Sequence, residues 1–199
     1  MPIRDLSRLL VVGLGNYSHP HTRHNVGMMA LDYTAAALLG SAPTWRLSKS
    51  VGGHVAETVL DESDVQGMPA GWTQHVVFLK PRTFMNLSGG PVARAARELG
   101  IRPENIIVFH DDLERKLGAV SMKAKGSASG HNGLKSMIAA LRSDVFRRVR
   151  IGIDRPVSKD PAAVGDYVLQ RFSDAEHAVL LRTGFPAAHE ALMRLISDG

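Results

Sequence analysis

Short apolar runs alternate with helical segments through most of this chain of 199 residues. Residues 25–39, 91–99 and 134–141 carry apolar side chains at helical spacing, and Ser173 and Glu176 form a capping-box pattern that opens a C-terminal helix with a break at Pro186. The strand-length apolar runs lie at residues 8–14, 51–60, 75–80, 105–109, 119–124 and 148–153. This alternation predicts an α/β fold with three layers, in which helices flank a twisted, mixed and largely parallel sheet. Since no repeat or linker divides the sequence, we expect a single domain over residues 1–199.

Polar side chains follow three of the predicted strands. Asn16 comes just after the first strand, Asn86 lies a few residues beyond residues 75–80, and Asp111 follows residues 105–109. In open α/β sheets, ligands bind outside the carboxyl ends of the strands. We therefore expect these side chains to share one site at that edge of the sheet.

His24 is the candidate general base of this site. A histidine base needs a partner that fixes its tautomer and stabilises the imidazolium, and Asp111 and Asp112 are the candidates. Side chains alternate along a strand, so we expect only one of the two to serve. The chain has no cysteine, which excludes thiol nucleophiles, thiolate zinc sites and disulfides. Imidazoles, carboxamides and a carboxylate together indicate base-assisted hydrolysis of a carbonyl, although each residue alone is equally compatible with a structural role.

Two other kinds of site match part of the sequence. His19, His21 and His24 have the spacing of the metal motif in metallo-β-lactamase-like hydrolases, but Arg23 stands where those enzymes carry an acid. We expect no metal, and a metal-dependent hydrolase remains an alternative. The turn at residues 13–15 lacks the third glycine of a dinucleotide fingerprint, because Ser18 takes its place, so no cofactor is expected.

Positive charge is concentrated in the second half of the chain. The net charge of the whole chain is +5, whereas residues 115–150 contain one acid, Asp144, against nine basic residues: Arg115, Lys116, Lys123, Lys125, Lys135, Arg142, Arg147, Arg148 and Arg150. The segment is typical either of a surface that follows nucleic-acid phosphates or of a solvated basic face. Charge alone does not decide between these two interpretations.

Segments that would direct the chain to a membrane are not seen in the sequence. No run approaches the roughly 20 apolar residues of a membrane span, and the first ten residues do not resemble a secretory signal. We expect no membrane partner and a cytoplasmic location, with an organellar one, for example mitochondrial, left open.

Six ordered blocks between about residue 9 and residue 169 resemble the bacterial-type peptidyl-tRNA hydrolases. The blocks are Gly13-Leu14-Gly15-Asn16, Thr22-Arg23-His24-Asn25-Val26-Gly27, the segment 81–89 with Phe84-Met85-Asn86, His110-Asp111-Asp112-Leu113, Gly130-His131-Asn132-Gly133 and Arg150-Ile151-Gly152-Ile153. The resemblance implies a monomer without metal or cofactor that binds tRNA. It implies hydrolysis of the ester between a peptide, or an N-blocked amino acid, and the tRNA 3′ ribose, which recycles the peptidyl-tRNA released during translation. A non-catalytic RNA-binding relative of the same fold is the alternative.

The resemblance also implies roles for individual residues. His24 corresponds to the catalytic base and Asp111 to its orienting acid. The carboxamides at the junction of peptide and ribose correspond to Asn16, Asn86 and Asn132, of which Asn16 and Asn132 are expected to be catalytic. The remaining substrate-binding positions are Phe84, Met85, His131, Lys123 and Arg150, the last two for tRNA phosphate.

Three segments depart from the family pattern. The loop from Asn16 to His24 is short and lacks the usual Pro-Gly, and residues 126–130 have fewer glycines than usual before His131, which predicts a stiffer lid. Residues 61–74 are expected to form an additional exposed loop. These departures concern the rim of the site rather than the reaction.

Overall fold

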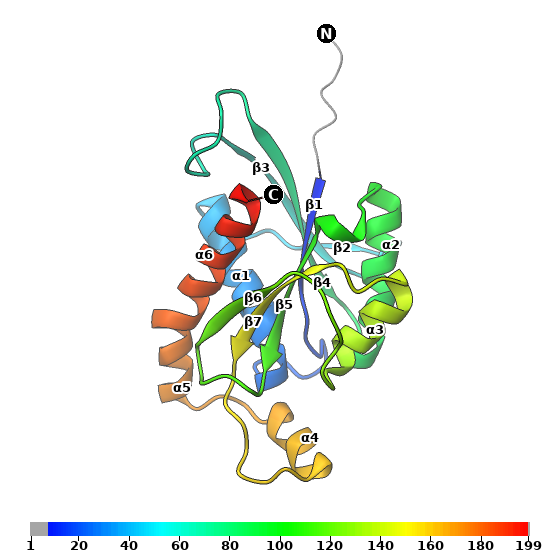
Figure 1. Ribbon diagram of the computed structural model, residues 1–199, viewed down its shortest axis with the longest axis vertical. Coiled ribbons are helices and arrows are strands. Elements are labelled where there is room, and N and C mark those ends of the chain that lie inside the picture. Colours follow the sequence, from blue (N-terminus) through cyan, green and yellow to red (C-terminus); the bar gives the residue numbers. More distant parts are fainter. Residues whose placement is uncertain (1–7, 199) are drawn as a thin grey trace.

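One seven-stranded sheet forms the centre of the computed structural model, which describes residues 8–198 (Figure 1). In the order β2-β3-β4-β1-β5-β7-β6, the four central strands β4, β1, β5 and β7 pair in parallel, and the pairs β2–β3, β3–β4 and β6–β7 are antiparallel. The expectation about the first ten residues lies mostly outside the described residues. The strands are β1 Arg8–Gly13, β2 Arg46–Ser48, β3 Gly53–Asp61, β4 Thr73–Pro81, β5 Ile106–Asp112, β6 Val120–Lys123 and β7 Arg147–Gly152.

Helices cover both faces of this sheet. α1 (Val26–Leu39) and α6 (Phe185–Ser197) pack on one face, and α2 (Gly89–Leu99) and α3 (Asn132–Leu141) pack on the other. The hydrophobic core has two parts, one on each face of the sheet. Along β1, Leu9 and Val11 pack in the part beneath α1 and α6, and Leu10 and Val12 pack in the part beneath α2 and α3, because successive side chains point to opposite faces. The predicted three-layer α/β architecture with a mixed, largely parallel sheet is therefore confirmed.

The C-terminal helices differ from the expected pattern. α5 (Asp174–Val179) begins with the predicted capping box and continues through a π-helical turn, Leu180–Gly184, into α6. The irregularity thus lies one turn before Pro186, which occupies the first turn of α6, where a missing N–H costs no helical hydrogen bond.

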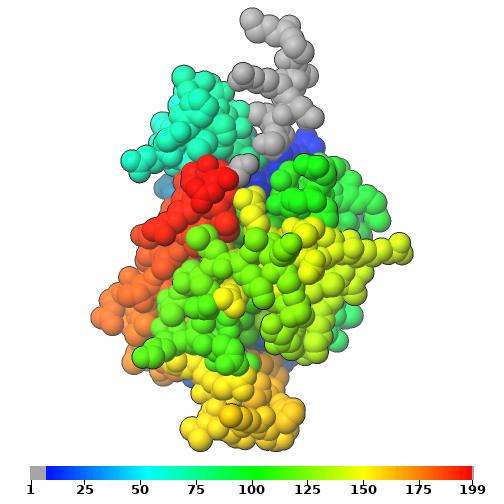
Figure 2. All heavy atoms as spheres, viewed as in Figure 1, coloured from blue at the N-terminus to red at the C-terminus, as the bar shows by residue number. Residues whose placement is uncertain are grey.

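Two elements were not predicted, and one loop differs from its prediction. β2 is an edge strand of only three residues, and α4 (Pro161–Leu169) forms a lobe at the lower end of the molecule, yellow to orange in Figure 2. Residues 61–74 were expected to be an exposed loop, but both ends belong to strands. Within the connection Val65 is buried, and Met68 and Trp72 pack against the core. Among the described residues, no helix is long and apolar enough to cross a bilayer.

Candidate active site

The parallel pairing of β1 with β5 brings the predicted site residues to one edge of the sheet. β5 carries Asp111 near its carboxyl end, and β1 leads through a loop into a 3-10 turn, Arg23–Asn25, that holds His24. α1 follows at once. Gly27 approaches β5 so closely that any side chain there would collide with the Phe109 carbonyl. This close contact between helix and strand places His24 beside Asp111.

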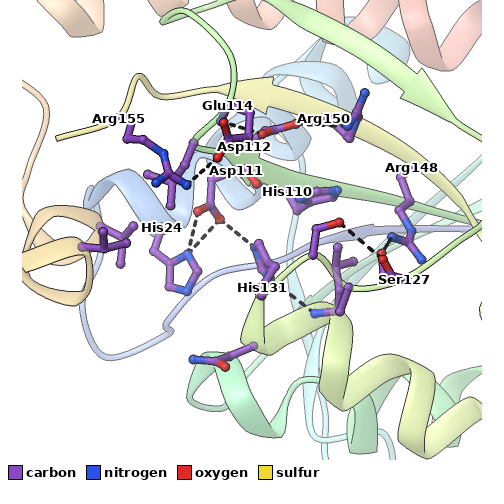
Figure 3. A pocket seen from close by; sticks show the side chains of 18 of the residues that line it. His24, His110, Asp111, Asp112, Glu114, Ser127, His131, Arg148, Arg150 and Arg155 are labelled. Atoms are coloured by element: carbon purple, nitrogen blue, oxygen red, sulfur yellow. Dashed lines mark hydrogen bonds and ion pairs between the residues drawn. The ribbon is translucent and has the colours of Figure 1, made fainter. Parts of the chain in front are cut away.

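The Asp111 carboxylate lies between two imidazoles (Figure 3). The Nδ1 atom of His24 is 2.8 and 2.9 Å from the two carboxylate oxygens, and the Nε2 atom of His131 is 2.9 Å from Oδ1. A buried carboxylate only accepts hydrogen bonds, so each of these nitrogens carries its proton. The lone pair of His24 is therefore on Nε2, which has no hydrogen-bond partner among the described residues.

His131 has no such free nitrogen. Its Nδ1 atom accepts hydrogen bonds from the backbone N–H groups of Gly133 and Leu134, at 3.1 and 3.3 Å, and thereby caps the N-terminus of α3. Since its Nε2–H donates to Asp111, both ring nitrogens are occupied. His131 therefore orients the carboxylate and begins the helix, and its geometry does not suit proton abstraction.

The electrostatics of the pair favour an ionised acid and a basic imidazole. Burial alone would raise the pKa of Asp111, but electrostatic attraction to His24 and His131 and the hydrogen bonds from both rings lower it well below its usual range. Burial would likewise lower the pKa of His24, but the Asp111 charge and hydrogen bond outweigh it, so the pKa of His24 is raised. Asp111 thus stabilises the imidazolium that forms when His24 takes a proton.

A third histidine, His110, is buried beside this pair. Its Nδ1–H donates to the Asp111 backbone carbonyl at 2.8 Å, and its ring lies edge-on to His131 with centroids 5.0 Å apart. Burial, followed by the nearby His131 charge, lowers the pKa of His110 to about 3, so the ring stays neutral. It is a neutral neighbour of the site rather than a candidate base.

These residues line a cavity of about 490 Å³. One wall is the segment 127–132, including Asn132, whose side chain is exposed to solvent. The opposite wall comes from α4, through Pro161, Val164, Gly165 and Val168. α4 was not predicted from the sequence, so its contribution to the cavity wall was not predicted either.

Asn16 is tied into the structure by its neighbours. Its Oδ1 accepts the Met85 backbone N–H at 2.6 Å, and the Asn25 side chain bonds both the N–H and the carbonyl of Asn16, at 2.9 and 3.0 Å. Asn25 was not among the predicted site residues, although it follows His24 directly in the motif. This network fixes the first loop to the segment 84–87.

The segment 84–87 lies beside the cavity, outside its lining. Phe84 is 55% exposed and Asn86 is also exposed, so both face outward, as substrate contacts must. Met85 was expected to bind substrate, but it is only 3% exposed and packs in the core. A 3-10 turn, Met85–Leu87, sends consecutive side chains in different directions, which explains why Met85 points inward.

Two predicted basic residues, Lys123 and Arg150, line the cavity. An Arg150 nitrogen lies 3.4 Å from Asp112, which also pairs with Arg115 at 3.4 Å. Asp112 therefore faces arginines while Asp111 faces imidazoles, as strand alternation predicted.

Arg148 does not belong to a solvated face. It is 1% exposed and donates to the backbone carbonyls of Gly126 and Ser127, the latter at 2.7 Å, so it anchors the loop before His131.

The residues that could bind a metal in the structure differ from those that the sequence motif suggested. In the part of the chain that the structure describes, the three ligand atoms close enough to share an ion belong to His24, Asp111 and His131, within 4.8 Å of one another. His19 and His21, which suggested the motif, are exposed and not part of this group. Hydrogen bonds between imidazole and carboxylate already join the three side chains.

Comparison with known proteins identifies related sequences. The family model described as peptidyl-tRNA hydrolase matches residues 10–199. The chain is 43% identical over 173 residues to a peptidyl-tRNA hydrolase of Mycobacterium bovis strain BCG, covering 85% of this chain and 82% of that protein. It is 39% identical over 173 residues to a probable peptidyl-tRNA hydrolase of Mus musculus, covering 87% and 78%.

Solved structures show the same similarity. A crystal structure of peptidyl-tRNA hydrolase in complex with N-propanol has a TM-score of 0.79 and 28% identity, covering 98% of this chain and 92% of that one. The structure of the Acinetobacter baumannii peptidyl-tRNA hydrolase has a TM-score of 0.75 and 27% identity, covering 96% and 88%. Sequence and fold therefore agree over nearly the whole length, and the chain belongs to the peptidyl-tRNA hydrolase family.

Proposed function

We propose that this cavity hydrolyses the ester between a peptide and the 3′ ribose of tRNA, with His24 as general base and Asp111 as its orienting acid. The observation that carries the proposal is the buried carboxylate between two imidazoles, of which only His24 keeps a nitrogen without a hydrogen-bond partner among the described residues. Family membership supports the substrate class and the hydrolase activity, and it does not favour the non-catalytic alternative.

In this mechanism a water molecule attacks the ester carbonyl while His24 Nε2 takes one of its protons. Asp111 holds the opposite ring nitrogen and stabilises the imidazolium. When the tetrahedral intermediate collapses, the ribose oxygen leaves and receives that proton from His24. The products are a peptide with a free carboxyl group, which then loses its proton to solvent, and a tRNA with a free 3′ hydroxyl, and the base is restored.

Asn132 is proposed to stabilise the developing oxyanion or to orient the attacking water. It is exposed on the cavity wall at the start of α3, where the helix dipole favours negative charge. Asn86 is proposed to hydrogen-bond the peptide backbone. Asn16 has only its Nδ2 group left for substrate, because Met85 occupies its Oδ1.

Because the proposed contacts are with the peptide backbone, the site does not discriminate between peptide sequences. A free aminoacyl ester offers no amide to these groups and leaves them unpaired, which penalises that substrate.

Lys123 and Arg150 are proposed to bind a tRNA phosphate at the basic side of the cavity. We further propose that the protein needs no metal, acts as a single-domain monomer and works in the cytoplasm, where translation supplies its substrate. The role of the family in translation supports the last point.

Release of tRNA from an N-acetylated aminoacyl-tRNA in the presence of chelator tests the function. The wild-type protein should hydrolyse it, and His24→Ala should lose about 10²–10⁴-fold in kcat, the usual contribution of a general base. His75→Ala is the control and should retain activity, because His75 pairs with Glu57 near the amino-terminal end of β4, at the opposite end of the strands from the site.

Each contrary result has a distinct meaning. Absence of hydrolysis by the wild-type protein would favour the RNA-binding alternative, and inhibition by chelator would favour a metal-dependent hydrolase. Near-normal turnover by His24→Ala would place the base elsewhere.

A further inference from the structure

Arg23 is a buried cation directly before the proposed base. It is only 7% exposed, and its guanidinium lies over the ring of Tyr167, 4.4 Å from the centroid, and near that of Phe172, at 5.1 Å. One of its nitrogens donates to Glu176 at 2.7 Å, while Nε and Nη1 have no hydrogen-bond partner among the described residues. Two rings and one carboxylate therefore hold this charge in place.

The three partners of Arg23 are Tyr167 near the end of α4, Phe172 in the connection that follows, and Glu176 in α5. α4 supplies one wall of the cavity but has few other attachments, since Val168 is its one buried residue. Further links are the Arg23 N–H to the Gln170 carbonyl at 2.8 Å, a β-bridge from Thr22 to Arg171, the Tyr167 hydroxyl to the Ile153 carbonyl at 2.6 Å, and the packing of Tyr167 and Phe172 against the core. Most of these attachments start from the turn that carries His24, and the largest side chain among them is Arg23.

We propose that Arg23 is a positioning residue for the reaction, whose guanidinium clamps Tyr167, Phe172 and Glu176 and so fixes the α4 wall against the turn that carries His24. Arg23 touches no reacting atom in this role and acts through His24 and through the wall. The inference therefore rests on the assignment of His24 as base. In a lobe that projects from the molecule, as α4 does in Figure 2, a short helix needs such a clamp to stay in place.

Losing the clamp should affect catalysis in two ways. A shift of the wall or of the turn by about 1 Å is enough to lower the rate about 10²-fold, because reacting groups must be closely aligned. Water would also enter around His24, whose burial lowers its pKa, and the pKa would therefore rise further. The acid limb of the kcat/KM profile should then move to higher pH.

Arg23→Met tests this proposal, since it keeps the length of the side chain and removes the charge. Arg171→Met is the matched control, because Arg171 is exposed in the same segment and pairs with Thr22 through its backbone. Hydrolysis of N-acetylated aminoacyl-tRNA would be measured against pH, and hydrogen exchange would be measured over residues 161–171 without substrate.

We expect Arg23→Met to lower kcat/KM roughly 10–100-fold, with a raised acid limb and faster exchange in α4. Arg23→Lys, which keeps the charge but not the planar fork, should recover part of the loss. Arg171→Met should match the wild type in all three measurements.

If Arg23→Met does not fold, Glu176→Gln replaces it. This variant keeps the capping box with Ser173, because glutamine serves at that position, while removing the charged partner of Arg23. It should shift kcat/KM and exchange in the same direction by a smaller factor.

Two results would overturn the proposal: kcat/KM within about twofold of the wild type in a folded variant, or a loss of activity with unchanged exchange in α4. Exchange is measured without turnover, and His24→Ala tests the base separately. A failure of this inference is thus distinguishable from a failure of the proposed function.

Discussion

Replacing Asp111 with asparagine should reverse the tautomer of His24. The carboxylate now accepts hydrogen bonds from two imidazoles, at 2.8–2.9 Å from His24 and 2.9 Å from His131. His131 contacts Oδ1, whereas His24 Nδ1 contacts both Oδ1 and Oδ2. An asparagine has one oxygen and one NH₂ group, so one of these two acceptors becomes a donor. His131 needs the oxygen, because its other nitrogen already accepts from the α3 backbone. The NH₂ group then takes the place of Oδ2, 2.9 Å from His24 Nδ1, and donates to that nitrogen, so the ring proton moves to Nε2.

A His24 ring protonated at Nε2 offers no lone pair to water in the cavity. The same exchange in a serine-protease triad costs about 10⁴ in kcat, and general-base catalysis as a whole contributes about 10²–10⁴. We therefore expect Asp111→Asn to lower kcat by about 10²–10⁴, equivalent to roughly 3–5 kcal/mol of activation free energy. KM should change little, since the carboxylate is buried beneath the two rings and does not contact substrate.

The pH dependence of the residual activity has a definite sign. Activity requires neutral His24, so it is lost as the pH falls below the pKa of His24. In the wild type, the Asp111 charge and hydrogen bond raise that pKa against the opposing effect of burial. Without the charge only burial remains, so the acid limb of kcat/KM should move to lower pH.

Single-turnover hydrolysis of N-acetylated aminoacyl-tRNA measures this effect apart from product release. Asp32→Asn is the isosteric control, since it also removes an acid from an ion pair, here with Lys80 away from the cavity. That control should keep kcat within about twofold, because neither partner of this ion pair lines the cavity. A variant with kcat near the wild-type value and a raised KM would refute the orienting role of Asp111.

The other predictions concern the rim, the basic residues and the helix that places the base. Asn132→Ala should lower kcat by roughly 10², since loss of one oxyanion donor costs about 3 kcal/mol; a raised KM with unchanged kcat would make it a ground-state contact instead. Lys123→Ala and Arg150→Ala should each weaken tRNA binding and make its salt dependence shallower by about 0.7–0.9 units, while a substrate cut down to the terminal nucleotide is still cleaved. Unchanged salt slopes would mean that these side chains merely solvate the surface. Gly27→Ala should destabilise the fold by about 3 kcal/mol, the upper end of the usual cost of overpacking, as measured by urea unfolding. Gly165→Ala, in open space on α4, is its control and should be neutral or slightly stabilising.

The arrangement of His24 and Asp111 could be predicted because it follows from regular structure. The apolar run of β5 ends where Asp111 begins, and parallel strands deliver their carboxyl ends to one edge. Alternation along β5 also separated Asp111 from Asp112 correctly. Periodicity thus predicted that only one of the two acids would face the base, and the family resemblance indicated Asp111.

The bond from His131 to Asp111 could not be predicted in this way. It depends on the path of residues 126–130, where Gly126, Ser129 and Gly130 have positive φ angles and Arg148 binds backbone carbonyls. The spacing of apolar residues in the sequence does not predict such a backbone path.

The sequence of α4 indicates a helix only weakly, through its first residues rather than through an apolar stripe. Asp160 caps the helix and Pro161 opens it, a recognisable start, but Val168 is its one buried residue. A helix that buries so little has almost no apolar stripe to detect. Its place in the molecule depends on contacts with distant residues such as Arg23.

The contact between Arg23 and Glu176 can form only after both residues have been synthesised. Arg23 and Glu176 are 153 residues apart, so at 5–20 residues per second the ribosome adds the second roughly 8–30 s after the first. During that interval the turn that carries His24 has no helix against its open side. A growing chain is itself a peptide joined to tRNA, and this cavity stays incomplete until the segment that carries Glu176 has been made.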